Sequence, residues 1–164
     1  MADKIRVGWF TFTCCEDSTI IFTELLNSYY RDWMKKIDFV HAKILRKDSY
    51  SELQPMDLAF VEGAITSDTQ EVKLKKIREK SKKLVAIGAC AVIGSPSNQR
   101  NFFNPKQHEQ IQSILEKFKY KDKVLKLSDI VVVDENVPGC PMDEVGFLNI
   151  LNKYINSQLV YPEP

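Results

Sequence analysis

The chain has 164 residues, of which 44% are hydrophobic, and its formal net charge is +1. This length suits one domain with a core of its own. The near-neutral charge gives no strong field for nucleic acid or an anionic membrane, so we expect neither as a partner. The longest apolar runs, such as Leu84–Ile87 and Ile130–Val133, are far too short to span a bilayer.

The first residues show neither a basic-then-apolar export segment nor a twin arginine, which favours a cytoplasmic location. Thiols stay reduced in that compartment. The four cysteines of the chain are therefore more readily interpreted as ligands or redox groups than as disulfides.

Apolar, β-branched runs alternate with amphipathic segments along the chain. The runs predict five strands, at Ile5–Phe12, Ile37–Leu45, Asp57–Val61, Leu84–Ala89 and Ile130–Val133. Helices are expected between most of them. The first helix is predicted to begin at Asp17 or Ser18, either of which can be its N-cap. The second is predicted at about 69–83. The last two are predicted from apolar residues spaced along one helix face, namely Ile111, Ile114, Leu115 and Phe118 in the third and Val145, Leu148, Leu151 and Ile155 in the fourth.

This alternation predicts an α/β fold with a mostly parallel sheet that helices cover on both faces. Five strands indicate a flavodoxin-like, doubly wound order, in which ligands bind at the carboxyl ends of the strands. We expect residues 1–157 to form a single domain and residues 158–164 to form a C-terminal tail.

The cysteines follow the ends of predicted strands. Cys14 and Cys15 come after the first strand, Cys90 after the fourth and Cys140 after the fifth. Because the carboxyl ends of parallel strands share one edge of a sheet, these four residues are expected to converge there. Neighbouring side chains of an extended strand point to opposite faces, so the chain must turn between Cys14 and Cys15 if both serve one ligand.

Other interpretations of the cysteines remain open. Any single cysteine can be an ordinary buried core residue. A structural zinc site is possible, but its ligands usually come from cysteine pairs two to four residues apart, unlike the spacing here. The number and softness of four thiolates fit a four-iron cluster.

Four stretches resemble a known family when taken in order. They are Thr13-Cys14-Cys15-Glu16-Asp17-Ser18, Val61-Glu62-Gly63-Ala64-Ile65, Gly88-Ala89-Cys90-Ala91-Val92-Ile93-Gly94 with Arg100-Asn101, and Val137-Pro138-Gly139-Cys140-Pro141. The family is that of the small subunit of nickel–iron hydrogenases and the related 20 kDa subunit of respiratory complex I. Adjacent first cysteines resemble the complex I subunit, whereas the stretch from Ala91 to Pro96 and Arg100-Asn101 resemble soluble hydrogenase subunits. Met142 stands where a second proline is common.

The resemblance implies that Cys14, Cys15, Cys90 and Cys140 bind one [4Fe-4S] cluster near the active site of a large partner subunit. In hydrogenases that partner carries the nickel–iron centre. No further cysteines exist for additional clusters, so electrons would pass to a further, electron-accepting subunit. On this interpretation the chain is an electron-transfer subunit of an oxidoreductase complex, and whether it has any activity alone is open.

The resemblance also suggests that Glu62 lies between cluster and partner and helps to pass protons; a surface carboxylate or a helix cap is the equally weighted alternative. Arg100, Asn101 and Phe102 follow Cys90 on a long loop, which we interpret as a docking surface for the partner. Two other functions remain as alternatives. One is a complex I-like subunit that passes electrons to a quinone, and the other is a structural zinc-binding interaction module.

Overall fold

The computed structural model describes residues 4–45 and 52–160, with side chains as far as residue 157. Its main sheet has five strands in the order β2-β1-β3-β5-β7, and all of its pairings are parallel. Numbered within this sheet alone, that is the order 2-1-3-4-5 of flavodoxin-like folds, which confirms the predicted fold class. The strands are β1 (Ile5–Thr11), β2 (Ile37–Ala42), β3 (Met56–Glu62), β5 (Ser81–Ile87) and β7 (Glu135–Val137).

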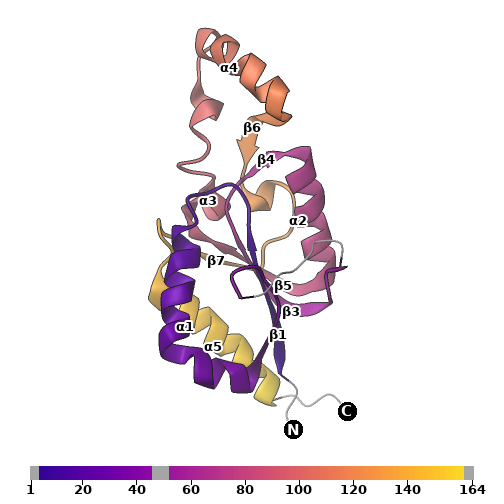
Figure 1. Ribbon diagram of the computed structural model, residues 1–164, viewed down its shortest axis with the longest axis vertical. Coiled ribbons are helices and arrows are strands. Elements are labelled where there is room, and N and C mark those ends of the chain that lie inside the picture. Colours follow the sequence, from indigo (N-terminus) through magenta and orange to yellow (C-terminus); the bar gives the residue numbers. More distant parts are fainter. Residues whose placement is uncertain (1–3, 46–51, 161–164) are drawn as a thin grey trace.

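Helices cover both faces of this sheet (Figure 1). On one face α1 (Asp17–Lys36) and α5 (Glu144–Val160) pack against Trp9, Phe60 and Ile87, and the indole of Trp9 stacks on Phe22 of α1 with 4.3 Å between ring centroids. On the other face α2 (Asp68–Lys80) and the short α3 (Gly88–Ile93) cover Val61 and neighbouring side chains. Each large apolar side chain buried in this way contributes roughly 1.5–3 kcal/mol, so the sheet is a rigid base for its carboxyl edge.

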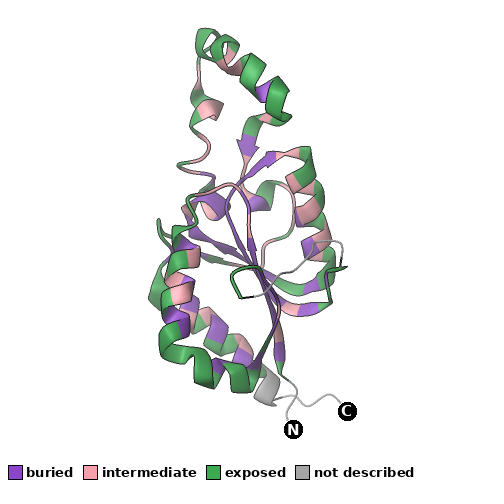
Figure 2. Cartoon of the chain, viewed as in Figure 1, coloured by how far each residue is buried: buried purple, intermediate pink, exposed green. Residues whose placement is uncertain are grey.

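A smaller unit, the arm, projects from that edge of the sheet (Figure 1). It consists of η2 (Gln99–Phe102), α4 (Pro105–Phe118) and β6 (Tyr120–Leu125), and β6 pairs antiparallel with β4 (Ile65–Ser67). Asn104 caps α4, because its side chain accepts a hydrogen bond from the backbone N–H of Gln107. Leu115 is the buried residue of α4, and the rest of its surface is largely exposed (Figure 2).

The prediction of a fifth strand at Ile130–Val133 is wrong. Those residues follow η3 (Leu127–Asp129) as an irregular segment, and the strand is β7, a few residues later. Ile130 and Val131 are adjacent in the sequence and both pack against the core on the α2 side, whereas neighbouring side chains of a strand point to opposite faces. Pairing with β5 starts only at Asp134, whose backbone N–H donates to the Leu84 carbonyl at 2.9 Å.

Two helix predictions also need correction. Helix α2 ends at Lys80 rather than near residue 83, and Arg78 Nη1 donates to the Ser81 carbonyl at 2.8 Å, where β5 begins. In α5 the buried side consists of Phe147, Leu151 and Ile155, whereas Val145 is 64% exposed. Phe147 packs against the rings of both Trp9 and Phe60, and these contacts place its side of the helix in the core.

Helix α5 continues to Val160, beyond the expected start of the tail at residue 158, and residues 161–164 lie outside the described part of the chain. Among the helices of the described residues, none is both long and apolar enough to cross a membrane.

Candidate functional site

The ends of four parallel strands lie in one row. Thr11 of β1 pairs with Glu62 of β3, Glu62 with Ile87 of β5, and Ile87 with Val137 of β7. Cys14, Cys90 and Cys140 each follow the last residue of their strand by three positions. The register of the sheet therefore brings together cysteines that are up to 126 positions apart in the sequence.

All four cysteines border one hollow at this edge, together with residues of α1, α3 and the β7–α5 connection. Cys90 is buried, Cys14 is partly buried, and Cys15 and Cys140 are exposed; all four are free thiols. The hollow is lined by Cys14, Cys15, Asp17, Ser18, Glu62, Ile87, Gly88, Ala89, Cys90, Gly139, Cys140 and Pro141. Among residues 4–45 and 52–160, no three Cys, His, Asp or Glu side chains are grouped closely enough to bind a single metal ion.

The chain bends between β1 and α1, which lets both adjacent cysteines reach the hollow. The bend is at Cys14, and Glu16 has a left-handed backbone conformation with φ of 65°. Backbone N–H groups point at both sulfur atoms, that of Glu16 at Cys14 and that of Asp17 at Cys15. Such donors stabilise thiolates and are typical of metal–thiolate loops.

The predicted cap of α1 by Asp17 or Ser18 is wrong. The N-cap residue is Glu16, whose side chain makes no capping hydrogen bond. Glu62 of β3, far away in the sequence, caps the helix instead. Its Oε1 accepts the backbone N–H of Ser18 at 3.1 Å, and its Oε2 accepts the Thr19 hydroxyl at 2.6 Å. Glu62 is only 3% exposed, so it is a buried helix-capping carboxylate rather than a surface residue.

Gly63, directly after β3, allows the segments that follow β3 and β1 to lie close together. Its φ is +93°, and a Cβ atom there would lie 2.8 Å from the backbone of Phe12. On either side, Phe12 N–H donates to the Glu62 carbonyl at 2.8 Å and Ala64 N–H donates to the Thr13 carbonyl at 2.9 Å. A side chain at position 63 would separate the cysteine-bearing segment from Glu62.

The Cys140 segment is attached to both other cysteine segments. Met142 N–H donates to the Ser18 hydroxyl at 3.2 Å, which links it to α1. Ala89 N–H donates to the Gly139 carbonyl at 2.7 Å, which links it to α3 beside Cys90. These two hydrogen bonds hold the Cys140 segment against the segments that carry the other cysteines.

The electrostatics of the hollow disfavour free thiolates. Burial and, after it, the negative charge of Glu62 raise the pKa of the Cys14 thiol to about 12. The pKa of Cys15 is also raised; the Asp17 N–H lowers it, but burial and the Asp17 carboxylate together outweigh that. A cationic group that binds here must displace these protons, which couples its binding to pH.

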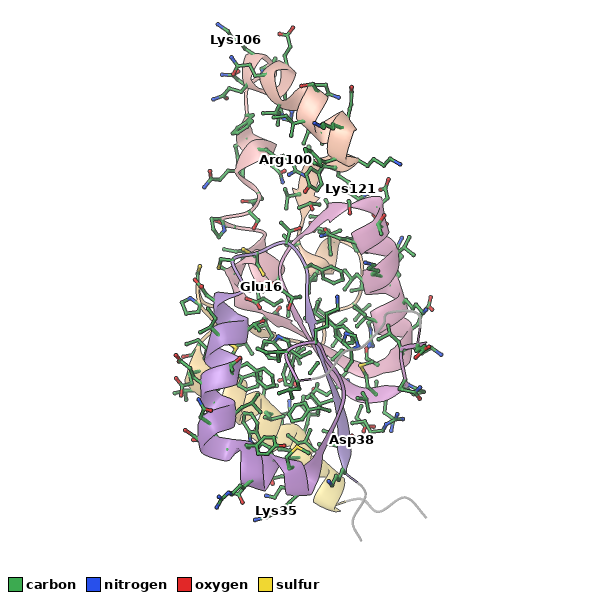
Figure 3. The ribbon with its side chains drawn as sticks, viewed as in Figure 1. Glu16, Lys35, Asp38, Arg100, Lys106 and Lys121 are labelled. Atoms are coloured by element: carbon green, nitrogen blue, oxygen red, sulfur yellow. The ribbon has the colours of Figure 1, made fainter. Side chains whose placement is uncertain are left out.

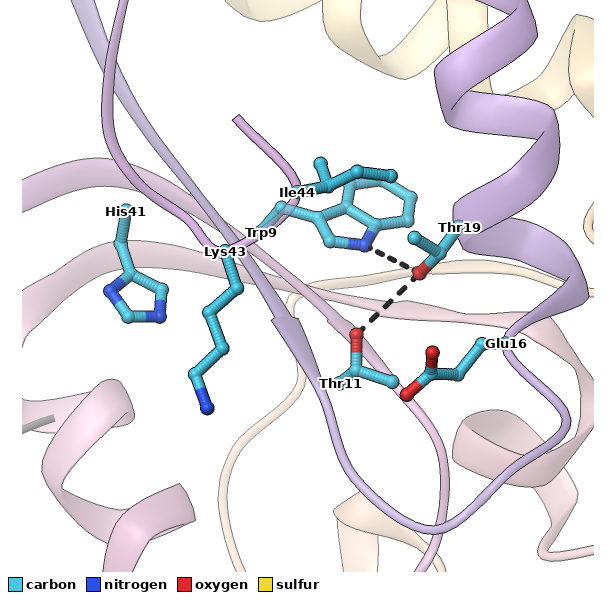
Figure 4. A pocket seen from close by; sticks show the side chains of 7 residues that line it. All are labelled: Trp9, Thr11, Glu16, Thr19, His41, Lys43 and Ile44. Carbon is cyan, nitrogen blue, oxygen red and sulfur yellow. Dashed lines mark hydrogen bonds between the residues drawn. The ribbon is translucent and has the colours of Figure 1, made fainter. Parts of the chain in front are cut away.

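A second pocket has a volume of about 350 Å³. Its lining residues are Trp9, Thr11, Glu16, Thr19, His41, Lys43 and Ile44 (Figure 4). Thr19 Oγ1 accepts a hydrogen bond from Trp9 Nε1 at 2.9 Å and lies 3.5 Å from Thr11 Oγ1. Since Thr19 donates its own proton to Glu62, these hydroxyls connect the pocket with the carboxylate at the cysteine hollow.

The three loop residues expected at a docking surface have different surroundings. Arg100 Nη2 donates to the Lys121 carbonyl at 2.8 Å, and both labelled side chains lie in the arm (Figure 3). Asn101 makes two bonds to the backbone of Val124, at 2.7 and 2.8 Å. Both residues therefore attach β6 to η2, whereas Phe102 is 79% exposed. Chain position alone did not distinguish these roles.

The family model described as "NADH ubiquinone oxidoreductase, 20 Kd subunit" matches residues 14–154. The chain belongs to this family. Membership confirms the resemblance found in the sequence, and the matched range includes all four cysteines.

Several relatives of this 20 kDa-subunit family member are subunits of hydrogenases. One subunit of the F420-non-reducing hydrogenase of Methanothermobacter marburgensis is 26% identical over 155 residues, covering 86% of this chain and 50% of the relative. The delta subunit of the NAD-reducing hydrogenase HoxS of Cupriavidus necator is 27% identical, covering 62% and 56%. The chain thus spans about half the length of the curated relatives it matches.

A solved structure supports the fold over nearly the whole length of both chains. It is a chain of the structure described as "NAD+-reducing [NiFe]-hydrogenase in the H2-reduced state", with a TM-score of 0.80 at 20% identity. The match covers 94% of this chain and 93% of that one.

Proposed function

We propose that this chain is the electron-transfer small subunit of a cytoplasmic nickel–iron hydrogenase-like complex and binds one [4Fe-4S] cluster through Cys14, Cys15, Cys90 and Cys140. The observation that carries the proposal is the single hollow at the carboxyl edge of the sheet that all four thiols line. Hydrogenase relatives and the family membership support the oxidoreductase context.

The donor set fits this cluster. Four thiols, two of them facing backbone N–H donors, are the soft, anion-stabilising surroundings that iron–sulfur clusters require. All four thiols line one hollow, and four thiolates are the ligand number of such a cluster. When bound, the cluster would supply one-electron transfer. The chain itself would contribute the thiolates, the N–H donors and a fixed sheet edge.

The reaction itself would take place elsewhere. A one-electron carrier offers no site for hydride or dihydrogen chemistry, so we propose that the chain is inert alone and acts with a large subunit that carries the nickel–iron centre. A further subunit would accept or supply electrons. We also propose that buried Glu62, at the hollow, passes protons toward the partner, in addition to capping α1.

Docking would occur at the cysteine edge. The exposed ring of Phe102, on the loop after Cys90, is our proposed anchor, and Arg100 and Asn101 hold the arm that presents it. Electron transfer needs a close, stable contact, so we expect an interface above about 1,600 Å² in total.

A complex I-like subunit that passes electrons to a quinone is the second candidate. The adjacent pair Cys14–Cys15 and the description of the matching family favour it. The partner's sequence separates the two, since a hydrogenase large subunit needs two cysteine pairs for nickel and iron.

Metal analysis with electron paramagnetic resonance tests the cluster itself. Anaerobically purified protein should contain about four iron and four sulfide per chain. Stoichiometric zinc without iron, under the same anaerobic preparation, would instead support the zinc-binding interaction module and end the proposal.

A further inference from the structure

Ser97 lies against the buried cysteine of the hollow. It follows α3 in the segment that leads to η2, and its Oγ is 3.2 Å from Cys90 Sγ. The same Oγ is 3.4 Å from the carbonyl oxygen of Thr13, the residue before Cys14. One hydroxyl thus bridges Cys90 and Thr13, which are 77 positions apart, in two segments that carry proposed ligands.

The protonation state of the sulfur determines the direction of this hydrogen bond. A serine hydroxyl has one proton to donate. When Cys90 is a thiol, it can donate to Ser97 while Ser97 donates to the Thr13 carbonyl. When Cys90 has lost its proton to become a metal ligand, its sulfur can only accept, so the Ser97 hydroxyl donates to it. Charge-assisted bonds are the stronger ones, which favours this second arrangement.

Two other proposed ligands have comparable donors, but of a different kind. Cys14 and Cys15 face the N–H groups of Glu16 and Asp17, which belong to the backbone and persist under most substitutions. The donor at Cys90 is a side chain, so a single substitution removes it. This makes Ser97 a position at which the electronic surroundings of the hollow can vary without a change of fold.

We propose that Ser97 raises the reduction potential of the group bound by the four cysteines, by donating a hydrogen bond to Cys90 Sγ. Hydrogen bonds to ligand sulfurs stabilise the more negative, reduced state and are one of the main determinants of such potentials. Ser97 is in this sense a positioning residue that acts through Cys90. The inference rests on the proposed cluster and adds what sets its potential.

The test is a redox titration of the purified complex, followed by electron paramagnetic resonance. Ser97→Ala should keep the iron content of the wild-type complex and show a more negative midpoint potential. Ser97→Thr retains the hydroxyl and should stay near the wild-type value. Ser113→Ala removes an exposed serine of α4 and is the matched control.

The outcomes separate this inference from the proposed function. A Ser97→Ala complex with full iron content and an unchanged potential would overturn the inference and leave the cluster standing. A wild-type complex without iron would overturn both. If Ser97→Ala loses its iron, Ser97→Cys, which keeps a weaker donor of similar size, decides instead: a lowered potential supports the role, and an unchanged one contradicts it.

Discussion

Glu62, at the end of β3, accepts the backbone N–H of Ser18 at 3.1 Å, across 44 positions of sequence. This contact joins the carboxyl end of β3 to the first turn of α1. The hydroxyl of Ser18 in turn accepts the backbone N–H of Met142, two residues after Cys140. A buried carboxylate therefore has a structural role at the cysteine hollow, whatever else it does.

Glu62→Gln separates the two roles of this residue. The amide keeps an oxygen that can accept the Ser18 N–H, while the exchangeable carboxyl proton is gone. If Glu62 relays protons, turnover of the complex should fall on the order of 100-fold, with iron content and assembly unchanged. Equal turnover of mutant and wild type across a pH series would leave Glu62 a structural role only. Glu62→Ala, which also strands a buried N–H, should in addition destabilise the fold by roughly 1–3 kcal/mol.

Replacement of any one cysteine by serine should lose or badly perturb the cluster. Serine keeps the size of the side chain but supplies a hard oxygen in place of a soft thiolate. Iron and sulfide content of Cys14→Ser, Cys15→Ser, Cys90→Ser and Cys140→Ser complexes measures this. Full iron content and an unaltered resonance signal in one variant would remove that residue from the ligand set.

Phe102→Ala tests the docking surface. Since the ring is 79% exposed, its loss should change folding stability by no more than about 0.5 kcal/mol. Assembly with the partner should nevertheless weaken, which native mass spectrometry after affinity purification can show. Val72→Ala, on α2 and 65% exposed, is the control and should assemble normally. Normal assembly of both variants would contradict the docking model. Arg100 is a poorer probe, because charge reversal there also breaks its bonds to β6.

Asn101→Ala should destabilise the arm. The variant loses the donor and the acceptor that hold Val124 of β6. With two hydrogen bonds gone, we expect a loss of roughly 1–3 kcal/mol in the free energy of unfolding, measured in urea. Asn27→Ala, at an exposed site of α1, should cost much less. Equal stability of the two variants would show that the arm is held by other contacts.

Tyr154 and Glu135 give a pH-dependent contribution to stability. Burial raises the pKa of Glu135, but hydrogen bonds from Tyr154 and Lys153 outweigh it and hold that pKa below its usual 4.5. A carboxylate with a lowered folded-state pKa stabilises the fold above its unfolded pKa, and this contribution disappears as pH falls through the folded value. Tyr154→Phe should therefore cost on the order of 1 kcal/mol near pH 7 and less in acid.

Urea unfolding of Tyr154→Phe and wild type, over a pH series and in the same iron-loaded state, checks this. The exposed Tyr30 offers the control Tyr30→Phe, which should show no such pH trend. A difference between Tyr154→Phe and wild type that stays constant down to the acid end would contradict the assigned role of Glu135.

The sequence by itself determined the sheet and the edge where the cysteines meet. Strands such as Ile5–Thr11 and Met56–Glu62 are apolar runs that need burial on both faces, and a parallel sheet places all their carboxyl ends together. Cys14, Cys90 and Cys140 follow those ends closely, so their convergence follows from topology. Only the tertiary structure decided that Glu62 caps α1, that Asn101 holds β6, that β7 replaces the apolar run at Ile130–Val133, and that Ser97 faces Cys90. The physical reason is that hydrophobic periodicity is a local signal, whereas the partner of a single polar group depends on which distant segment the packed core brings within hydrogen-bonding distance.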